Sequence, residues 1–154
     1  MMEYTTLITV HIISVVLLLG VGTGSAFYKF MADRSENLEV IVHTNKMVVL
    51  ADWLFTTPSA ILQPLSGVLL INLMGLSLWT PWLLISVILY IFAGALWLIA
   101  VYFQIRMKNM ALLAQKQQMF LGKEYFRLVK YWIWLGVFSF LSMGSVFYLM
   151  INKL

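Results

Sequence analysis

The chain has 154 residues, of which 62% are hydrophobic and 10% are charged, with a formal net charge of +4 and a mean hydropathy of +0.93. This composition is typical of an integral membrane protein and excludes an ordinary soluble domain. The lack of cysteine excludes a disulfide, a thiolate metal site and a cysteine nucleophile. Because the basic residues flank apolar segments, we expect the lipid bilayer, and no nucleic acid, as the partner.

Four apolar stretches are long enough to cross a bilayer, which takes about 20 helical residues. They cover residues 5–30, 40–73, 81–105 and 128–152. Their apolar runs lack the alternation of polar and apolar residues that a membrane β-strand requires. The sequence therefore predicts an all-α, polytopic membrane protein with a single domain, residues 1–154, folded as a bundle of four transmembrane helices.

The basic side chains set the expected orientation. Nine of the ten Lys and Arg residues lie at the connection between the first and second stretches or between the third and fourth. The positive-inside rule then places loops 31–39 and 107–127 in the cytoplasm and both termini outside. We expect a multi-pass protein of the bacterial inner (plasma) membrane, with Tyr125 among the aromatic residues at the inner interface. The third helix is expected to extend into the cytoplasm and to turn near Gly122.

The first stretch holds a histidine and a small-residue motif. His11 is a costly residue inside a membrane, and it can hydrogen-bond a neighbouring helix, ligate a haem iron or move a proton. Gly20 and Gly24 form a GxxxG motif, which favours close helix packing in the bundle. Two alternatives stay open for this motif: a homodimer contact, and room for a flat cofactor.

The second stretch is unusually polar. Asp52 falls near mid-membrane, with Thr56 one helical turn later, and antiparallel helices bring Gln63 level with His11. These residues predict either a kinked, internally satisfied helix or a polar ligand pocket with Asp52 at its floor. Ser86 of the third stretch is the further member expected for this pocket.

Two prolines interrupt the same stretch. Pro58 and Pro64 lack a backbone donor and therefore free the carbonyls of Leu54 and Ala60, one turn earlier. Such carbonyls at membrane depth need other partners or a cavity. One face of the third stretch offers polar and aromatic side chains that we expect to point inward. They are Ser86, Tyr90, Gly94, Trp97, Gln104 and Arg106.

The chain resembles the DUF2269 family of predicted integral membrane proteins. The resemblance rests on His11 with the glycines at 20–24, on the A-D-W-L-F-T block at 51–56, and on the L-Q-P-L-S-G block at 62–67. It continues through the later spans, including Tyr90, Gly94, Trp97 and the Q-I-R block at 104–106, and covers nearly the whole chain. It implies four helices and no particular activity.

A more distant similarity is to the HemJ-type protoporphyrinogen oxidases, small membrane proteins that bind b-type haem. By this similarity His11 corresponds to the haem-linked histidine. Ser86 stands where that family carries a lysine, and a serine cannot serve as the second ligand. The similarity implies haem b as the cofactor, His11 as the ligand of its iron, and Gly20 and Gly24 as neighbours of the porphyrin.

Three functions stay open at this stage. The first is a haem-binding or redox-linked membrane protein acting through His11, which as an enzyme would be a haem-dependent oxidoreductase. The second is a non-enzymatic accessory or assembly subunit, with a homodimer or another membrane protein as its partner. The third is a small-molecule or proton pathway that uses Asp52.

Overall fold

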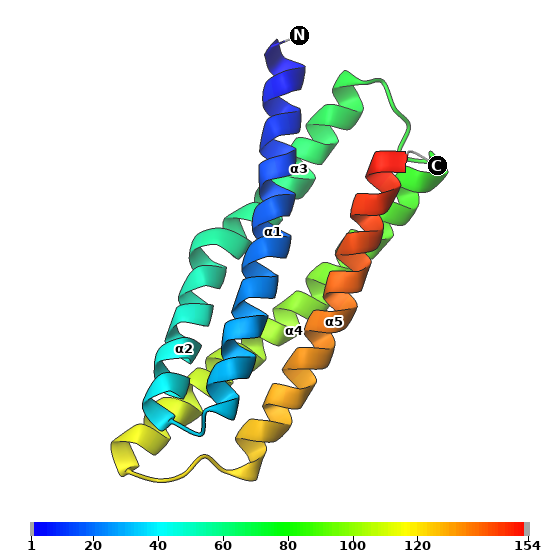
Figure 1. Ribbon diagram of the computed structural model, residues 1–154. Coiled ribbons are helices and arrows are strands. Elements are labelled where there is room, and N and C mark those ends of the chain that lie inside the picture. The colour runs from blue at the N-terminus through cyan, green and yellow to red at the C-terminus, as the bar shows by residue number, and fades with distance from the viewer. Residues whose placement is uncertain (1, 153–154) are drawn as a thin grey trace.

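The computed structural model describes residues 2–152, and every element in that range is helical (Figure 1). The elements are α1 (Met2–Arg34), α2 (Leu38–Ala51), the π-helix η1 (Asp52–Thr56), α3 (Thr57–Leu73), α4 (Pro81–Gln117) and α5 (Lys123–Asn152). Because α2, η1 and α3 form one continuous rod, four helical rods are long and apolar enough to cross a membrane. The prediction of an all-α bundle with four spans is confirmed.

The rods pair into two antiparallel hairpins. In the first, α1 packs along α2, η1 and α3, and in the second, α4 packs along α5. Figure 1 shows that α1 begins and α5 ends at the same end of the bundle. The loops after α1 and α4 lie together at the other end, which we call the basic end because most Lys and Arg residues flank these loops.

The hydrophobic core is concentrated at the basic end. There a cluster of buried side chains from α2, α4 and α5 joins the two hairpins, with Ile41, Met107 and Tyr125 at 2% exposure or less. Towards the opposite end the shared core shrinks to Val15 and Ala93 with Met143. The hairpins are therefore held firmly at one end and only lightly at the other.

Local signals explain where the helices begin and end. Asn37 caps α2 with its side-chain oxygen, which accepts from the backbone N–H groups of Glu39 and Val40 at 3.0 and 3.3 Å. Pro81 opens α4, where its missing N–H costs nothing. The helix then runs to Gln117 and α5 starts at Lys123. At 37 residues, α4 is longer than a bilayer crossing by several turns, which confirms that the helix continues beyond the span; that this extension is cytoplasmic stays a prediction.

The rod containing α2 and α3 widens into a π-helix at Asp52–Thr56. The backbone N–H of Thr57 donates to the carbonyl of Asp52, five residues earlier, just before Pro58. A proline at that point cannot continue the α-helical hydrogen bonds, and π-turns are found frequently at functional sites. The sequence predicts a distortion here, but the widening itself is a feature that only the structure reveals.

Pro64 frees the carbonyl of Ala60, as predicted, and the structure supplies its partner. The Tyr90 hydroxyl of α4 donates to the Ala60 oxygen at 2.7 Å. This hydrogen bond links the two hairpins in the half of the bundle where few other contacts join them. A carbonyl in the membrane interior would otherwise be unsatisfied, at a cost of several kcal/mol.

We expect Tyr90→Phe to lower the free energy of unfolding by about 1–3 kcal/mol, because it leaves the Ala60 carbonyl without a donor. Unfolding in mixed micelles with rising SDS content measures the change. Pro64→Ala restores a backbone N–H four residues after Ala60, so Tyr90→Phe should cost clearly less in that background. Equal costs in both backgrounds would show that the Ala60 carbonyl is not the reason.

A buried polar network ties three rods together at the basic end; we call its members, Lys29, Asp33, Asn45 and Tyr125, the basic-end network. Lys29 donates to Asp33 and to the Tyr125 hydroxyl, both at 3.0 Å. The hydroxyl donates to Asp33 at 2.7 Å and accepts from Asn45 at 2.8 Å. Lys29 is 1% exposed and Tyr125 is fully buried, so the Tyr125 side chain packs inside the bundle and does not face lipid. Its expected depth at the inner interface stays a prediction.

Candidate functional site

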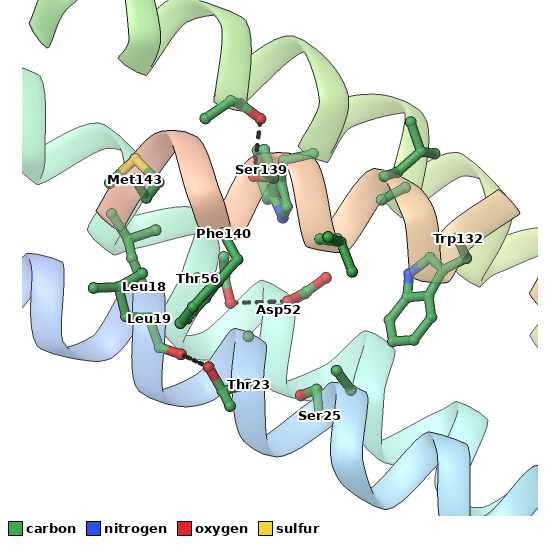
Figure 2. A pocket seen from close by; sticks show the side chains of 18 of the residues that line it. Leu18, Leu19, Thr23, Ser25, Asp52, Thr56, Trp132, Ser139, Phe140 and Met143 are labelled. Atoms are coloured by element: carbon green, nitrogen blue, oxygen red, sulfur yellow. Dashed lines mark hydrogen bonds between the residues drawn. The ribbon is translucent and has the colours of Figure 1, made fainter. Parts of the chain in front are cut away.

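A cavity of about 580 Å³ lies between the two hairpins, mostly between α1 and α5 with α4 and η1 behind (Figure 2). Its walls are mainly apolar and aromatic, which is the usual character of a small-molecule site, and its volume is within the usual range. The aromatic residues of its wall are Phe27, Phe30, Tyr90, Trp97, Trp132 and Phe140.

The cavity opens through the side of the bundle. Phe27 of α1 and Phe140 with Leu141 of α5 belong to its wall and are 59%, 50% and 58% exposed. Phe140 and Leu141 lie near the middle of α5, whose length and composition suit a membrane span, so the surface around them is one that lipid would cover. An opening on this side would let a molecule enter from the bilayer without passing through water.

Asp52 forms the polar corner of this apolar cavity. Its carboxyl group is 6% exposed, and one oxygen, Oδ1, accepts a hydrogen bond from Thr56 at 2.8 Å. Figure 2 shows this bonded pair lying between α1 and α5. The other oxygen, Oδ2, has no hydrogen-bond partner within residues 2–152. The π-helix places the carboxyl group here, since Asp52 and Thr56 are its first and last residues.

Two side chains of α4 extend the polar corner. The Trp97 indole and the Gln104 amide lie close enough to the Asp52 carboxyl to interact with it, although neither reaches hydrogen-bond geometry. Trp97 Nε1 and Gln104 Oε1 are both buried and have no partner in the described part of the chain. Asp52 Oδ2, Trp97 Nε1 and Gln104 Oε1 are therefore three buried polar atoms of the corner that lack a well-formed hydrogen bond in the described residues.

Only some residues of the predicted inward face of the third span line the cavity. Tyr90, Gly94, Trp97 and Gln104 line it. Ser86 is buried, but its hydroxyl donates within α4 to the Trp82 carbonyl at 2.7 Å, away from the cavity. Arg106 lies at the basic end, half-exposed and paired with Glu124.

Of the expected pocket residues, Asp52 and Thr56 line the cavity, whereas Gln63 and Ser86 do not. Gln63 instead meets His11, which confirms the prediction that the two residues lie level. Its amide nitrogen donates to His11 Nε2 at 3.1 Å, so the imidazole proton is on Nδ1, which contacts Ser66 Oγ at 2.9 Å. The polar residues of the second span thus fall into two groups: Asp52 and Thr56 line the cavity, and Gln63 and Ser66 contact His11.

The surroundings of His11 do not fit a haem ligand. Both ring nitrogens are engaged by side chains of α3, and His11 is not part of the cavity wall. Among residues 2–152, no group of three or more His, Cys, Asp or Glu side chains gathers as a metal site. The arrangement fits the other expectation for His11, a hydrogen bond between membrane helices.

The close helix contact predicted at Gly20 and Gly24 lies elsewhere. A Cβ atom built at either residue would meet nothing within 4 Å, and neither glycine lines the cavity, so they do not make room for a flat cofactor there. The close approach is at Gly67 instead, where a Cβ would come within 3.3 Å of the His11 ring. The α1–α3 contact therefore depends on Gly67 and on the His11 hydrogen bonds.

Comparison with known proteins agrees with the sequence resemblance. No curated protein and no solved structure matches the chain. The family model described as "Predicted integral membrane protein (DUF2269)" matches residues 5–154, which is nearly the whole chain. The four apolar rods agree with that description. The chain therefore belongs to the DUF2269 family of predicted integral membrane proteins.

Proposed function

We propose that the protein binds a small, membrane-dissolved molecule in the cavity between its two hairpins, with the molecule's polar head at Asp52. We further propose that it sits in the bacterial inner membrane with its basic end in the cytoplasm and both termini outside, following the distribution of Lys and Arg. The structure of the cavity favours this small-molecule role over the purely structural role of an accessory subunit.

One observation carries the proposal: the unpaired, buried Asp52 Oδ2 in the wall of a cavity of about 580 Å³. A buried polar atom without a partner costs free energy, and an ionisable one inside a membrane costs more. A bundle selected only for stability would gain from an apolar residue there. A ligand that bonds to Asp52 would offset the cost whenever the cavity is occupied.

Filling the cavity tests the proposal. We expect the protein in phosphatidylcholine nanodiscs to bind radiolabelled dodecanol saturably, above the uptake of empty nanodiscs. Gly94→Phe should abolish this binding, because Gly94 lines the cavity and a Cβ there meets nothing within 4 Å. Gly144→Phe is the matched control, since Gly144 is equally open but outside the cavity wall. Saturable binding that survives Gly94→Phe would contradict this location.

Haem association through His11, with haem b near Gly20 and Gly24, is the other specific function that the sequence predicts, and a visible spectrum tests it. Because both His11 nitrogens are engaged, we expect the purified protein from haem-replete cells to be colourless. A Soret band that disappears in His11→Ala, but persists in the matched variant His43→Ala, would contradict this expectation. It would also require the contacts with Gln63 and Ser66 to open.

A further inference from the structure

The polar corner of the cavity combines the Asp52 carboxyl group with the side chains of Trp97 and Gln104. The Gln104 oxygen Oε1 and, when Asp52 is ionised, the Asp52 oxygen Oδ2 can only accept hydrogen bonds. The donors of the corner are Trp97 Nε1 and the Gln104 amide nitrogen, which both lie towards the Asp52 carboxyl group. Asp52 and Gln104 are 6% and 5% exposed, so bulk water does not readily satisfy these atoms. A head group that donates two or more hydrogen bonds would pair with both acceptors at once.

The charge of the cavity wall is equally one-sided. Among the residues that line the cavity, Asp52 is the one carboxylic acid. No Lys, Arg or His side chain lines the cavity. Lys29 is buried too, but its ammonium group donates to Asp33 and Tyr125 in the basic-end network and does not line the cavity. A carboxylate in an apolar site without a counter-charge attracts a cation more strongly than it would in water.

The remaining wall suits the body of such a cation. Trp97, Phe27 and Phe140 line the cavity with aromatic rings that are open to a ligand cation. The rings of Trp132 and Phe30 add apolar surface, since Lys29 and Arg34 already lie 5.9 and 5.3 Å from their centroids. Aromatic faces attract cations and also bury apolar surface. The same wall carries no Lys, Arg or His side chain to pair with an anion, and an ionised Asp52 would repel one.

We propose that the cavity binds a lipophilic amine in its protonated form, with an ammonium head that carries N–H donors and an apolar tail or ring system. The ammonium pairs with Asp52 and donates to Gln104 Oε1, and the tail lies against the aromatic wall and leaves between Phe27 and Phe140. This inference rests on the proposed function and names the chemical class of its ligand.

A neutral hydroxyl head is the closest competitor. It can donate to Asp52 and accept from Trp97, but its single proton cannot reach both acceptors. It also leaves the carboxylate without a counter-charge. The ammonium adds the Coulomb attraction of a second full charge in an apolar site, so it should bind more tightly than the hydroxyl.

Dodecylammonium and dodecanol test the inference as a matched pair of probes with the same tail. Both are titrated into the protein in phosphatidylcholine nanodiscs at pH 7, where an alkylammonium is protonated, with concentrations expressed per mole of lipid and empty nanodiscs subtracted. We expect dodecylammonium to bind at least about tenfold more tightly than dodecanol. Asp52→Asn should remove that preference, and a monodisperse size-exclusion profile with an unchanged helical circular-dichroism spectrum shows that the variant is folded.

Glu39→Gln is the charge-matched control, because it removes an exposed carboxylate on α2 outside the cavity. It should leave the preference for dodecylammonium intact. Equal binding of the two probes, or a preference that survives Asp52→Asn, would overturn the amine assignment while leaving the cavity as a binding site. Absence of saturable binding for both probes would overturn the proposed function itself.

Discussion

Asp33→Asn is expected to lower the free energy of unfolding by about 3–5 kcal/mol, because it leaves a buried ammonium without its counter-charge. Lys29 is 1% exposed and 3.0 Å from Asp33, and the pair sits where α1 meets the core of the basic end. Unfolding in mixed micelles with rising SDS content measures the loss. Replacing both residues together, Lys29→Met with Asp33→Leu, should recover most of it.

The control for Asp33→Asn is the other ion pair of the described chain. Arg106 and Glu124 are 45% and 46% exposed, so Glu124→Gln should cost less than about 1 kcal/mol. A similar small cost for Asp33→Asn would show that Lys29 reaches water in the membrane-embedded protein and that the network is not buried.

Tyr125→Phe is expected to have the second largest effect. The hydroxyl joins α5 to α1 and α2 by accepting from Lys29 and Asn45 and by donating to Asp33. Its loss leaves buried groups unsatisfied, at about 1–3 kcal/mol each, in the place where the hairpins are most firmly joined. The same unfolding experiment should therefore show a loss of more than about 2 kcal/mol.

Tyr131→Phe gives the matched comparison, since it removes the same hydroxyl from an exposed position on α5. It should change stability by less than about 0.5 kcal/mol. If the two variants behave alike, the basic-end network does not join the hairpins, and the apolar core around Met107 must hold them alone.

Much of the fold follows from the sequence because it depends on local patterns. Apolar length predicts the four spans, and antiparallel geometry brings Gln63 level with His11. The prolines predict which carbonyls are freed, including that of Ala60. The partner of that carbonyl, Tyr90, lies 30 residues away, and no local pattern selects it from the other polar side chains of α4.

The basic-end network shows where such reasoning fails. The i, i+4 spacing of Lys29 and Asp33 is visible in the sequence and signals an ion pair on α1. Tyr125, which joins this pair in the basic-end network, is 92 residues from Asp33 in the sequence. It lies near the end of a span, where an interfacial aromatic residue is expected. Only the packing of α5 against α1 and α2 reveals that it is buried.

The candidate site was predictable by residue type more than by arrangement. An aspartate in an apolar span indicates a site by itself, and Asp52 does line the cavity. Trp97 and Gln104 could be assigned to an inward face, but their approach to Asp52 depends on the π-helix. The small residues gave the weakest guide, because the close contact falls at Gly67 rather than in the GxxxG motif.

The lateral opening at Phe27 and Phe140 has a consequence for how ligands compete. Occupancy depends on the mole fraction of ligand dissolved in the bilayer, so the lipid acts as a reservoir that concentrates apolar molecules beside the protein. Each added methylene favours that reservoir by about 0.8 kcal/mol, or about fourfold in concentration, even if it never touches the protein. Dose-response curves in aqueous units would therefore rank ligands by partitioning as much as by fit.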